Sequence, residues 1–287
     1  MTIGWSNYHA HTKFCDGRAT MEESVDRAIQ DNIKILGFSS HAPVPFHTKW
    51  TMPRERLTNY LHEIDVLKER YSDFIQIYRS LEIDYIPNLI NPHSFNLFNL
   101  DYIIGSVHFV DEYPDGEPWS FDGGEEEFLN GLNQIFNNDF ITCAKRYFHL
   151  VREMLWLHPP TVLGHFDKIR MHNSTTNLFN ETDAWYVEEI DRTLDVIQKS
   201  GVIVEINTKA YDRGLKIFPS VDMFPKLASR NIPITINSDC HHIEKMILGF
   251  EYVAQELLNN GINKVKVFTE GIWIDVTLTA KGLELPV

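Results

Sequence analysis

The chain has 287 residues, of which 43% are hydrophobic and 12% aromatic, so it is long enough to bury a large core without disulfide bonds. Its 40 acidic and 26 basic side chains give a net charge of −14, which disfavours duplex DNA and anionic membranes because both require a basic partner surface. The three cysteines lack CxxC spacing, the apolar stretches are too short to span a membrane and the first six residues have no secretion signal, so we expect a reduced, cytoplasmic protein.

Short apolar runs alternate with amphipathic segments along the chain. The first run, at 5–9, precedes a predicted helix whose start is marked by Thr20 and Glu23, the two polar residues of a capping box. Helical patterns also occur at 53–71, 125–157 and 246–257, where apolar residues recur at intervals of three and four. The other predicted strands lie at 33–39, 75–83, 102–107, 161–164, 202–206, 232–237 and 265–269.

This alternation of strands and helices implies a parallel sheet with right-handed crossover connections. Seven or eight such units favour a closed α/β barrel. Because no linker rich in Pro, Gly or Ser divides the chain, we expect residues 1–287 to form a single domain. A doubly wound open sheet fits the same pattern.

Histidines and carboxylates follow the predicted strands. His9 and His11 stand two residues apart at the end of the first strand, so both imidazoles can reach one cation. Other residues of these types near strand ends are Asp16, His41, Glu82, His108, His165, Asp239 and His241. In a parallel barrel the carboxyl ends open on one face, so these six histidines and three carboxylates should converge on a metal site. Nitrogen and oxygen ligands without thiolate favour two or three ions of zinc, manganese or iron.

The order of these motifs resembles that of the PHP (polymerase and histidinol phosphatase) family. The motifs are HxHT, SSHAP, a mid-chain glutamate, GSVH, GHFD, EINT and SDCH, and together they extend over nearly the whole chain. The resemblance implies a distorted seven-stranded α/β barrel that holds three divalent ions. It also implies a ligand partition, with His9, His11, Glu82 and Asp239 around the first ion, Glu82, His108 and His165 around the second, and Asp16, His41 and His241 around the third.

The expected activity is hydrolysis of a phosphate monoester, and the resemblance implies L-histidinol phosphate, a metabolite of histidine biosynthesis, as the substrate. A metal-bridging hydroxide would attack phosphorus, and either His241 or Asp239 would pass a proton to the departing alkoxide. Arg170 and Arg213 follow the GHFD and EINT motifs and are the expected phosphate contacts, with Lys209 a weaker candidate. The ammonium group of histidinol requires an acid, for which the sequence offers Asp84, Asp111, Glu112 and Asp122.

Two other functions fit parts of the sequence. One is another PHP phosphoesterase, either a phosphodiesterase or exonuclease or a protein-tyrosine phosphatase, and the other is a non-catalytic scaffold module. An exonuclease requires a basic, aromatic-lined groove, for which the sequence has no Lys/Arg cluster, and a scaffold should lack some ligands. The negative net charge does not oppose a small phosphorylated metabolite as partner, because three dications would outweigh the three carboxylates that hold them.

Overall fold

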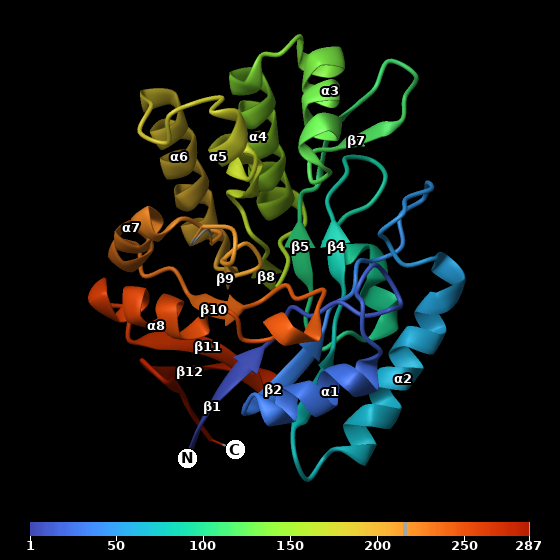
Figure 1. Ribbon diagram of the computed structural model, residues 1–287, viewed down its shortest axis with the longest axis vertical. Coiled ribbons are helices and arrows are strands. Elements are labelled where there is room, and N and C mark those ends of the chain that lie inside the picture. Colours follow the sequence, from blue (N-terminus) through green and yellow to red (C-terminus); the bar gives the residue numbers. More distant parts are fainter. Residues whose placement is uncertain (215–216, 287) are drawn as a thin grey trace.

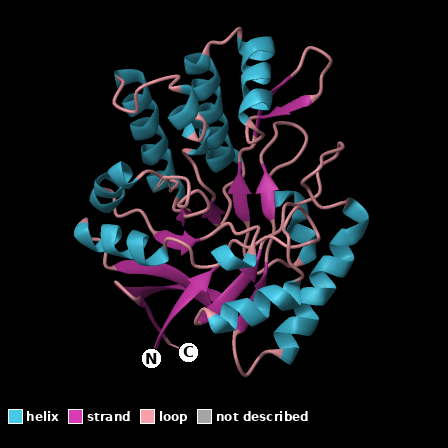
Figure 2. Cartoon of the chain, in the orientation of Figure 1, coloured by secondary structure: helices cyan, strands magenta, loops and turns pink. Residues whose placement is uncertain are grey.

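A computed structural model describes the fold of residues 1–214 and 217–286 (Figure 1). Many of the strands lie near the middle of the molecule with helices around them, and others lie along its edges, as Figure 2 shows. Several of the central strands are buried on both faces, as expected for parallel strands between helices and a filled interior. The parallel strands are β1 (Thr2–Asn7), β2 (Ile33–Phe38), β3 (Gln76–Arg79), β4 (Glu82–Asp84), β5 (Ile104–Ser106), β8 (Val162–Leu163), β9 (Ile203–Asn207) and β10 (Ile234–Asn237).

These strands pair in two groups that follow the order of the chain. The first group is β1, β2 and β3, and the second is β4, β5, β8, β9 and β10. Since only Ser80 and Leu81 separate β3 from β4, these two strands share one of the seven positions expected for the barrel. Single parallel bridges, Ala10 with Cys240 and His41 with Glu82, join the two groups. The predicted α/β fold is therefore confirmed, and the predicted closure into a distorted barrel rests on these isolated bridges.

The carboxyl-terminal part differs from the prediction. Residues 265–269 lie in β11 (Lys264–Thr269), which pairs with β12 (Ile272–Thr279) in antiparallel orientation. Strand β13 (Gly282–Leu285) extends this antiparallel sheet and pairs with the first residues of β1. The later residues of β1 pair with β2, so β1 connects the antiparallel strands to the barrel. Thr2 near one end of the chain consequently pairs with Leu285 near the other, in the lower part of Figure 1.

The helices largely follow the predicted pattern. Helix α1 (Met21–Gln30) begins at the predicted capping box, in which the backbone N–H of Glu23 donates to Thr20 Oγ1 at 3.2 Å. The predicted helical segment 125–157 is two helices, because Asn137 and Asn138 adopt left-handed backbone conformations and the Asp139 side chain caps the second helix. The other helices are α2 (Leu57–Arg70), α3 (Glu125–Phe136), α4 (Phe140–Leu157), α5 (Asn173–Thr176), α6 (Ala184–Ser200), α7 (Phe224–Ser229) and α8 (Phe250–Asn259).

A short antiparallel hairpin, β6 (Phe109–Glu112) and β7 (Pro118–Ser120), lies between β5 and α3. It occupies most of the segment between the GSVH motif and the next helix, and it leads directly to Asp122. No helix in residues 1–214 and 217–286 has both the length and the apolar character needed to traverse a lipid bilayer.

Gly37 in β2 allows a close approach that fixes the core behind the site. A Cβ atom at this position would overlap the hydroxyl oxygen of Tyr102, which donates a hydrogen bond to the carbonyl oxygen of Tyr8. Because Gly37 and Tyr102 are both buried, Gly37→Ala should lower the free energy of unfolding by about 3 kcal/mol, as overpacking of a core does. Denaturant unfolding of Gly37→Ala, Tyr102→Phe and the double variant measures this effect. The two losses should be less than additive, since Tyr102→Phe removes the overlapping atom, and additive losses would contradict this explanation.

Candidate metal centre

The nine predicted ligand residues converge where the parallel strands of the barrel end. Each has a ring nitrogen or carboxylate oxygen within 3.7 Å of that of another member. Eight of the side chains are at most 15% exposed. The members come from successive strand ends: His9, His11 and Asp16 after β1, His41 after β2, Glu82 at the start of β4 just after β3, His108 after β5, His165 after β8, and Asp239 and His241 after β10.

Glu82 lies at the centre of this cluster. Its Oε2 atom is 2.9 Å from His41 Nδ1 and 3.2 Å from His9 Nε2. Its Oε1 atom is 3.0 Å from His165 Nε2 and 3.7 Å from His108 Nε2. A carboxylate that faces histidines with both oxygens is suited to bridge two cations.

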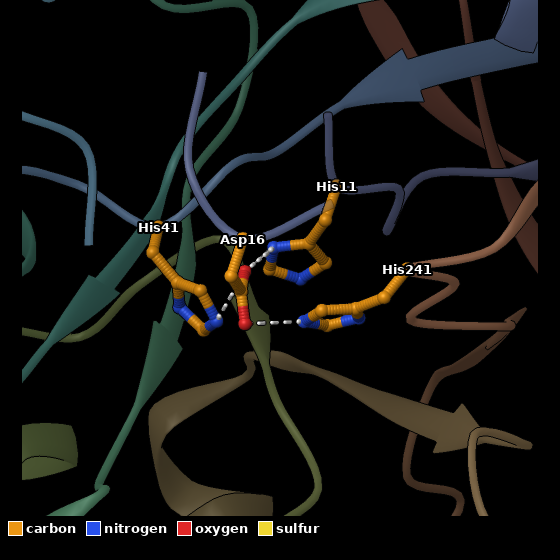
Figure 3. Close-up of side chains that lie close together, drawn as sticks. All are labelled: His11, Asp16, His41 and His241. Carbon is orange, nitrogen blue, oxygen red and sulfur yellow. Dashed lines mark ion pairs between the residues drawn. The ribbon is translucent and has the colours of Figure 1, made fainter. Parts of the chain in front are cut away.

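A second set of imidazole rings surrounds Asp16, and Figure 3 shows these rings pointing toward its carboxylate. Its Oδ2 atom is 3.2 Å from His241 Nε2. Its Oδ1 atom is 3.9 Å from both His11 Nδ1 and His41 Nε2. At 32%, Asp16 has the most exposed side chain of the nine, so this part of the cluster borders solvent.

The donor atoms fit divalent cations. Six of the buried polar atoms make no hydrogen bond to any described residue: His9 Nε2, His11 Nε2, Asp16 Oδ1, His41 Nδ1, Glu82 Oε2 and His165 Nδ1. Such unpaired atoms are costly in a protein interior unless an ion or water engages them. Ligand atoms lie within 4.8 Å of one another in three groups: His9, His11 and Glu82; His41, Glu82 and His108; and His11, Asp16, His41 and His241. Because two of the histidines each belong to two groups, the predicted partition among three ions stays a prediction.

Two further carboxylates orient the histidines. Glu205 Oε1 accepts a hydrogen bond of 2.6 Å from His9 Nδ1, and Asp84 Oδ1 accepts one of 2.9 Å from His108 Nδ1. Each bond holds a proton on Nδ1 and leaves Nε2 of the ring to face the cluster. Glu205 lies in the EINT motif but received no role from the sequence. Asp84 was one of four acids considered for the ammonium group, whereas the structure buries it against His108.

The electrostatic environment favours the ligand forms of the carboxylates and of some imidazoles. Burial raises the pKa of the Glu82 and Asp239 carboxyls, but the surrounding histidines and, at Asp239, the Lys209 ammonium hold both values well below their usual range. Burial lowers the pKa of the His11 and His165 imidazoles. At His9 and His108 burial lowers the pKa, but the facing carboxylates, Glu205 and Asp84 foremost, raise it above its usual value. Ionised carboxylates and neutral imidazoles are the forms that bind metal ions.

The two arginines expected to bind phosphate do not contact the nine ligands in the described part of the chain. Arg170 is 7% exposed, and its Nε atom donates to Asp167 at 2.8 Å. Its other two nitrogens contact Glu181 at 3.4 Å and the carbonyl oxygen of Ile217. Arg213 is exposed in the turn that follows β9. Phosphate binding by either arginine stays a prediction, and the contacts of Arg170 favour an anchoring role for that side chain.

Two lysines lie much nearer to the cluster. Lys168 Nζ is 3.4 Å from His108 Nε2, and Lys209 Nζ is 3.4 Å from His241 Nε2. The sequence placed Lys209 third among the phosphate candidates and did not select Lys168. The position of Lys168 directly after the GHFD motif is the signal that could have identified this lysine.

Comparisons with known proteins agree with this architecture. A family model described as "PHP domain" matches residues 7–209. A protein of Schizosaccharomyces pombe named "Probable histidinol-phosphatase" is 27% identical over 285 residues, which cover 92% of this chain and 89% of the relative. The protein of Bacillus subtilis named "Histidinol-phosphatase" is 25% identical over 266 residues, which cover 86% of this chain and 96% of the relative.

Solved structures share the fold. A histidinol phosphate phosphatase from Lactococcus lactis, crystallised with zinc, L-histidinol and phosphate, has a TM-score of 0.69 and 18% identity and covers 99% of this chain and 100% of its own. A HisK structure from Listeria monocytogenes has a TM-score of 0.73 and 21% identity and covers 86% of this chain and 99% of its own. The family model matches most of this chain, and the ligand-type side chains gather at the strand ends. The chain therefore belongs to the PHP domain family.

Proposed function

We propose that this protein is a metal-dependent phosphomonoesterase that hydrolyses L-histidinol phosphate to L-histidinol and phosphate in histidine biosynthesis. The convergence of nine ligand-type side chains at the barrel opening carries the proposal. Relatives aligned over most of the chain bear the name histidinol-phosphatase, and the similar Lactococcus structure contains zinc with both reaction products, which supports the choice of substrate. For an enzyme that acts on this small metabolite, we propose the cytoplasm as location.

We further propose that the nine side chains hold two or three ions of zinc, manganese or iron. When bound, such ions activate a water molecule for attack on phosphorus and stabilise charge on the phosphoryl oxygens. Glu205 and Asp84 orient two of the imidazoles through their Nδ1 protons. Either His241 or Asp239 could pass a proton to the departing alkoxide. The His241 side chain is 15% exposed and that of Asp239 is 1% exposed, which favours His241 because it is accessible to a substrate that enters from solvent.

A phosphate-release panel tests the proposed substrate. The metal-loaded protein is given histidinol phosphate, nucleoside monophosphates, phosphotyrosine, a generic aryl phosphate and a phosphodiester. The kcat/KM for histidinol phosphate should exceed the others by about 10⁴-fold, because a site that pairs the polar groups of its substrate rejects analogues that lack them. The Glu82→Gln variant, purified in parallel, reports any contaminating phosphatase.

The other outcomes of the panel distinguish the remaining hypotheses. Preference for phosphotyrosine would identify a protein-tyrosine phosphatase, and preference for the diester would identify a phosphodiesterase or exonuclease. No turnover of any ester by protein with measured metal bound would indicate a scaffold module. Each of these results would refute histidinol-phosphate hydrolysis as the main activity.

A further inference from the structure

Lys168 is a buried cation at the edge of the metal centre. It begins the 3-10 turn Lys168–Arg170 that follows β8, and it is only 2% exposed. Its ammonium group donates a hydrogen bond of 2.7 Å to Asp122 and lies 3.4 Å from His108 Nε2. A lysine is rarely buried so deeply without a paired charge or a function.

Lys209 approaches the same centre from the segment after β9. Its ammonium group donates to Asp239 Oδ1 at 3.2 Å and lies 3.4 Å from His241 Nε2, and its side chain is 29% exposed. The charges of both lysines lower the pKa of the Asp122 carboxyl below its usual range, although its burial raises it. The two ammonium groups therefore act on a common region beside the cluster.

We propose that Lys168 and Lys209 bind the phosphoryl oxygens of the substrate and of the phosphate product. This inference rests on the proposed phosphatase function, and it assigns to lysines the role that the sequence gave to Arg170 and Arg213. Phosphate is a dianion that accepts several hydrogen bonds, and lysine is a common partner for it because its ammonium group is a compact charge with three donors.

The contacts of the two lysines explain why their donors are available to phosphate. Three of the atoms that they contact, His108 Nε2, His241 Nε2 and Asp239 Oδ1, are ligand atoms of the proposed metal centre. Such an atom cannot bind a metal ion and accept a close ammonium group at the same time without cost, because the two cations repel each other at short distance. An anion between the ammonium groups and the ions would relieve that repulsion.

Arg170 does not offer comparable donors. Its three guanidinium nitrogens contact Asp167, Glu181 and the carbonyl oxygen of Ile217. Asp167 also accepts the backbone N–H of Ser220 at 3.0 Å, so the arginine belongs to a bonded network that joins two loops. Breaking a buried pair of this kind is costly, which favours an anchoring role.

Calorimetric titration with inorganic phosphate tests the proposal on the full-length, metal-loaded protein. Lys209→Met and Lys168→Met should each weaken phosphate binding by about tenfold to a hundredfold, the value of a lost hydrogen bond to a charged group. The matched control is Lys226→Met, because Lys226 forms an ion pair of 2.9 Å with Asp191 in another part of the molecule. This control should bind phosphate as the unmodified protein does.

Metal affinity is the second measurement, made by competition titration of zinc into the metal-free proteins. Removal of a neighbouring positive charge should leave zinc affinity unchanged or increase it. Phosphate and zinc affinity should therefore separate in the two lysine variants. A parallel loss of both would mean that the lysines only support the cluster, and unchanged phosphate affinity would also overturn the proposal.

Two additional variants keep the proposal testable if Lys168→Met does not fold. Asp122→Asn retains Lys168 but removes the carboxylate that competes with phosphate, so phosphate should bind several-fold more tightly; equal or weaker binding contradicts the proposal. Arg213→Gln should keep phosphate affinity, and a loss confined to this variant would assign phosphate to the arginine. Because the probe is inorganic phosphate, the two proposals can fail separately. If phosphate binding depends on the lysines but histidinol phosphate is not hydrolysed, the proposed function is refuted and this inference is retained.

Discussion

Replacement of Glu82 by Gln should abolish phosphate release and remove most of the bound metal. The Glu82 carboxylate lies between histidines on both of its oxygens, and an amide would present a neutral, partly donating group to them. Changes in the outer partners of metal ligands typically reduce metal affinity by about 10 to 100-fold, so loss of a central ligand should exceed about 100-fold. Elemental analysis of the purified variant and a zinc competition titration measure the effect.

Two comparisons make the Glu82 result specific. Asp84→Asn alters a carboxylate two residues away that accepts hydrogen bonds from the outer ring nitrogen and the backbone N–H of His108, so its loss of affinity should be intermediate. Glu69→Gln makes the same chemical change on the exposed face of α2 and should have no effect. Normal metal content in Glu82→Gln would exclude Glu82 as a ligand.

Replacement of Glu205 by Gln should lower metal affinity by about 10 to 100-fold without removing any ligand. The Glu205 carboxylate accepts hydrogen bonds from His9 Nδ1 at 2.6 Å and from the side chain of Asn237 at 3.0 Å. Its other oxygen accepts bonds from the backbone of His165 at 3.1 Å and from the side chain of Asn207 at 2.9 Å. An amide can satisfy only one of these two sides, so either the His9 proton or the second pair of donors loses its acceptor.

The tautomer of His9 distinguishes this positioning role from a general loss of stability. In the unmodified protein, ¹⁵N NMR should find the proton of the His9 ring on Nδ1, whereas in Glu205→Gln the other tautomer should be populated. Glu189→Gln is the matched control, because Glu189 is a buried carboxylate on α6 that forms an ion pair of 2.8 Å with Arg152 on α4. It should lower thermal stability but not zinc affinity. An unchanged His9 tautomer together with unchanged zinc affinity would disprove the role of Glu205.

The convergence of the nine ligand-type side chains could be predicted from the sequence because each lies within a few residues of a strand end. His9 and His11 share one side of the extended chain that follows β1, and the barrel brings the remaining strand ends together whatever the lengths of the connecting helices. Their roles therefore depend on local spacing and on the fold class, both of which are written in short motifs.

The contacts proposed for phosphate depend on finer geometry. Lys168 and Arg170 stand two residues apart in one 3-10 turn, where residues three apart share a face, so they point in different directions. The sequence does not reveal which of the two directions is inward. Glu205 is a similar case, because β9 is buried on both faces and alternation along the strand gives no orientation.

The sequence also contains a signal for β12. Ile272, Ile274, Val276 and Leu278 alternate along β12, and this period of two predicts a strand with one buried face. A strand pattern of this kind does not specify its partners, and β12 pairs with both β11 and β13 in antiparallel orientation.

The bridges that join the two strand groups lie within the metal centre itself. One of them consists of two proposed ligands, His41 and Glu82. In the other, Ala10 and Cys240 each stand between two ligands in the sequence. Ions held jointly by side chains from both groups would act as cross-links across the places where the barrel is least continuous. Metal occupancy and barrel closure are then thermodynamically linked. A chelator would therefore lower the stability of the fold as well as the catalytic activity.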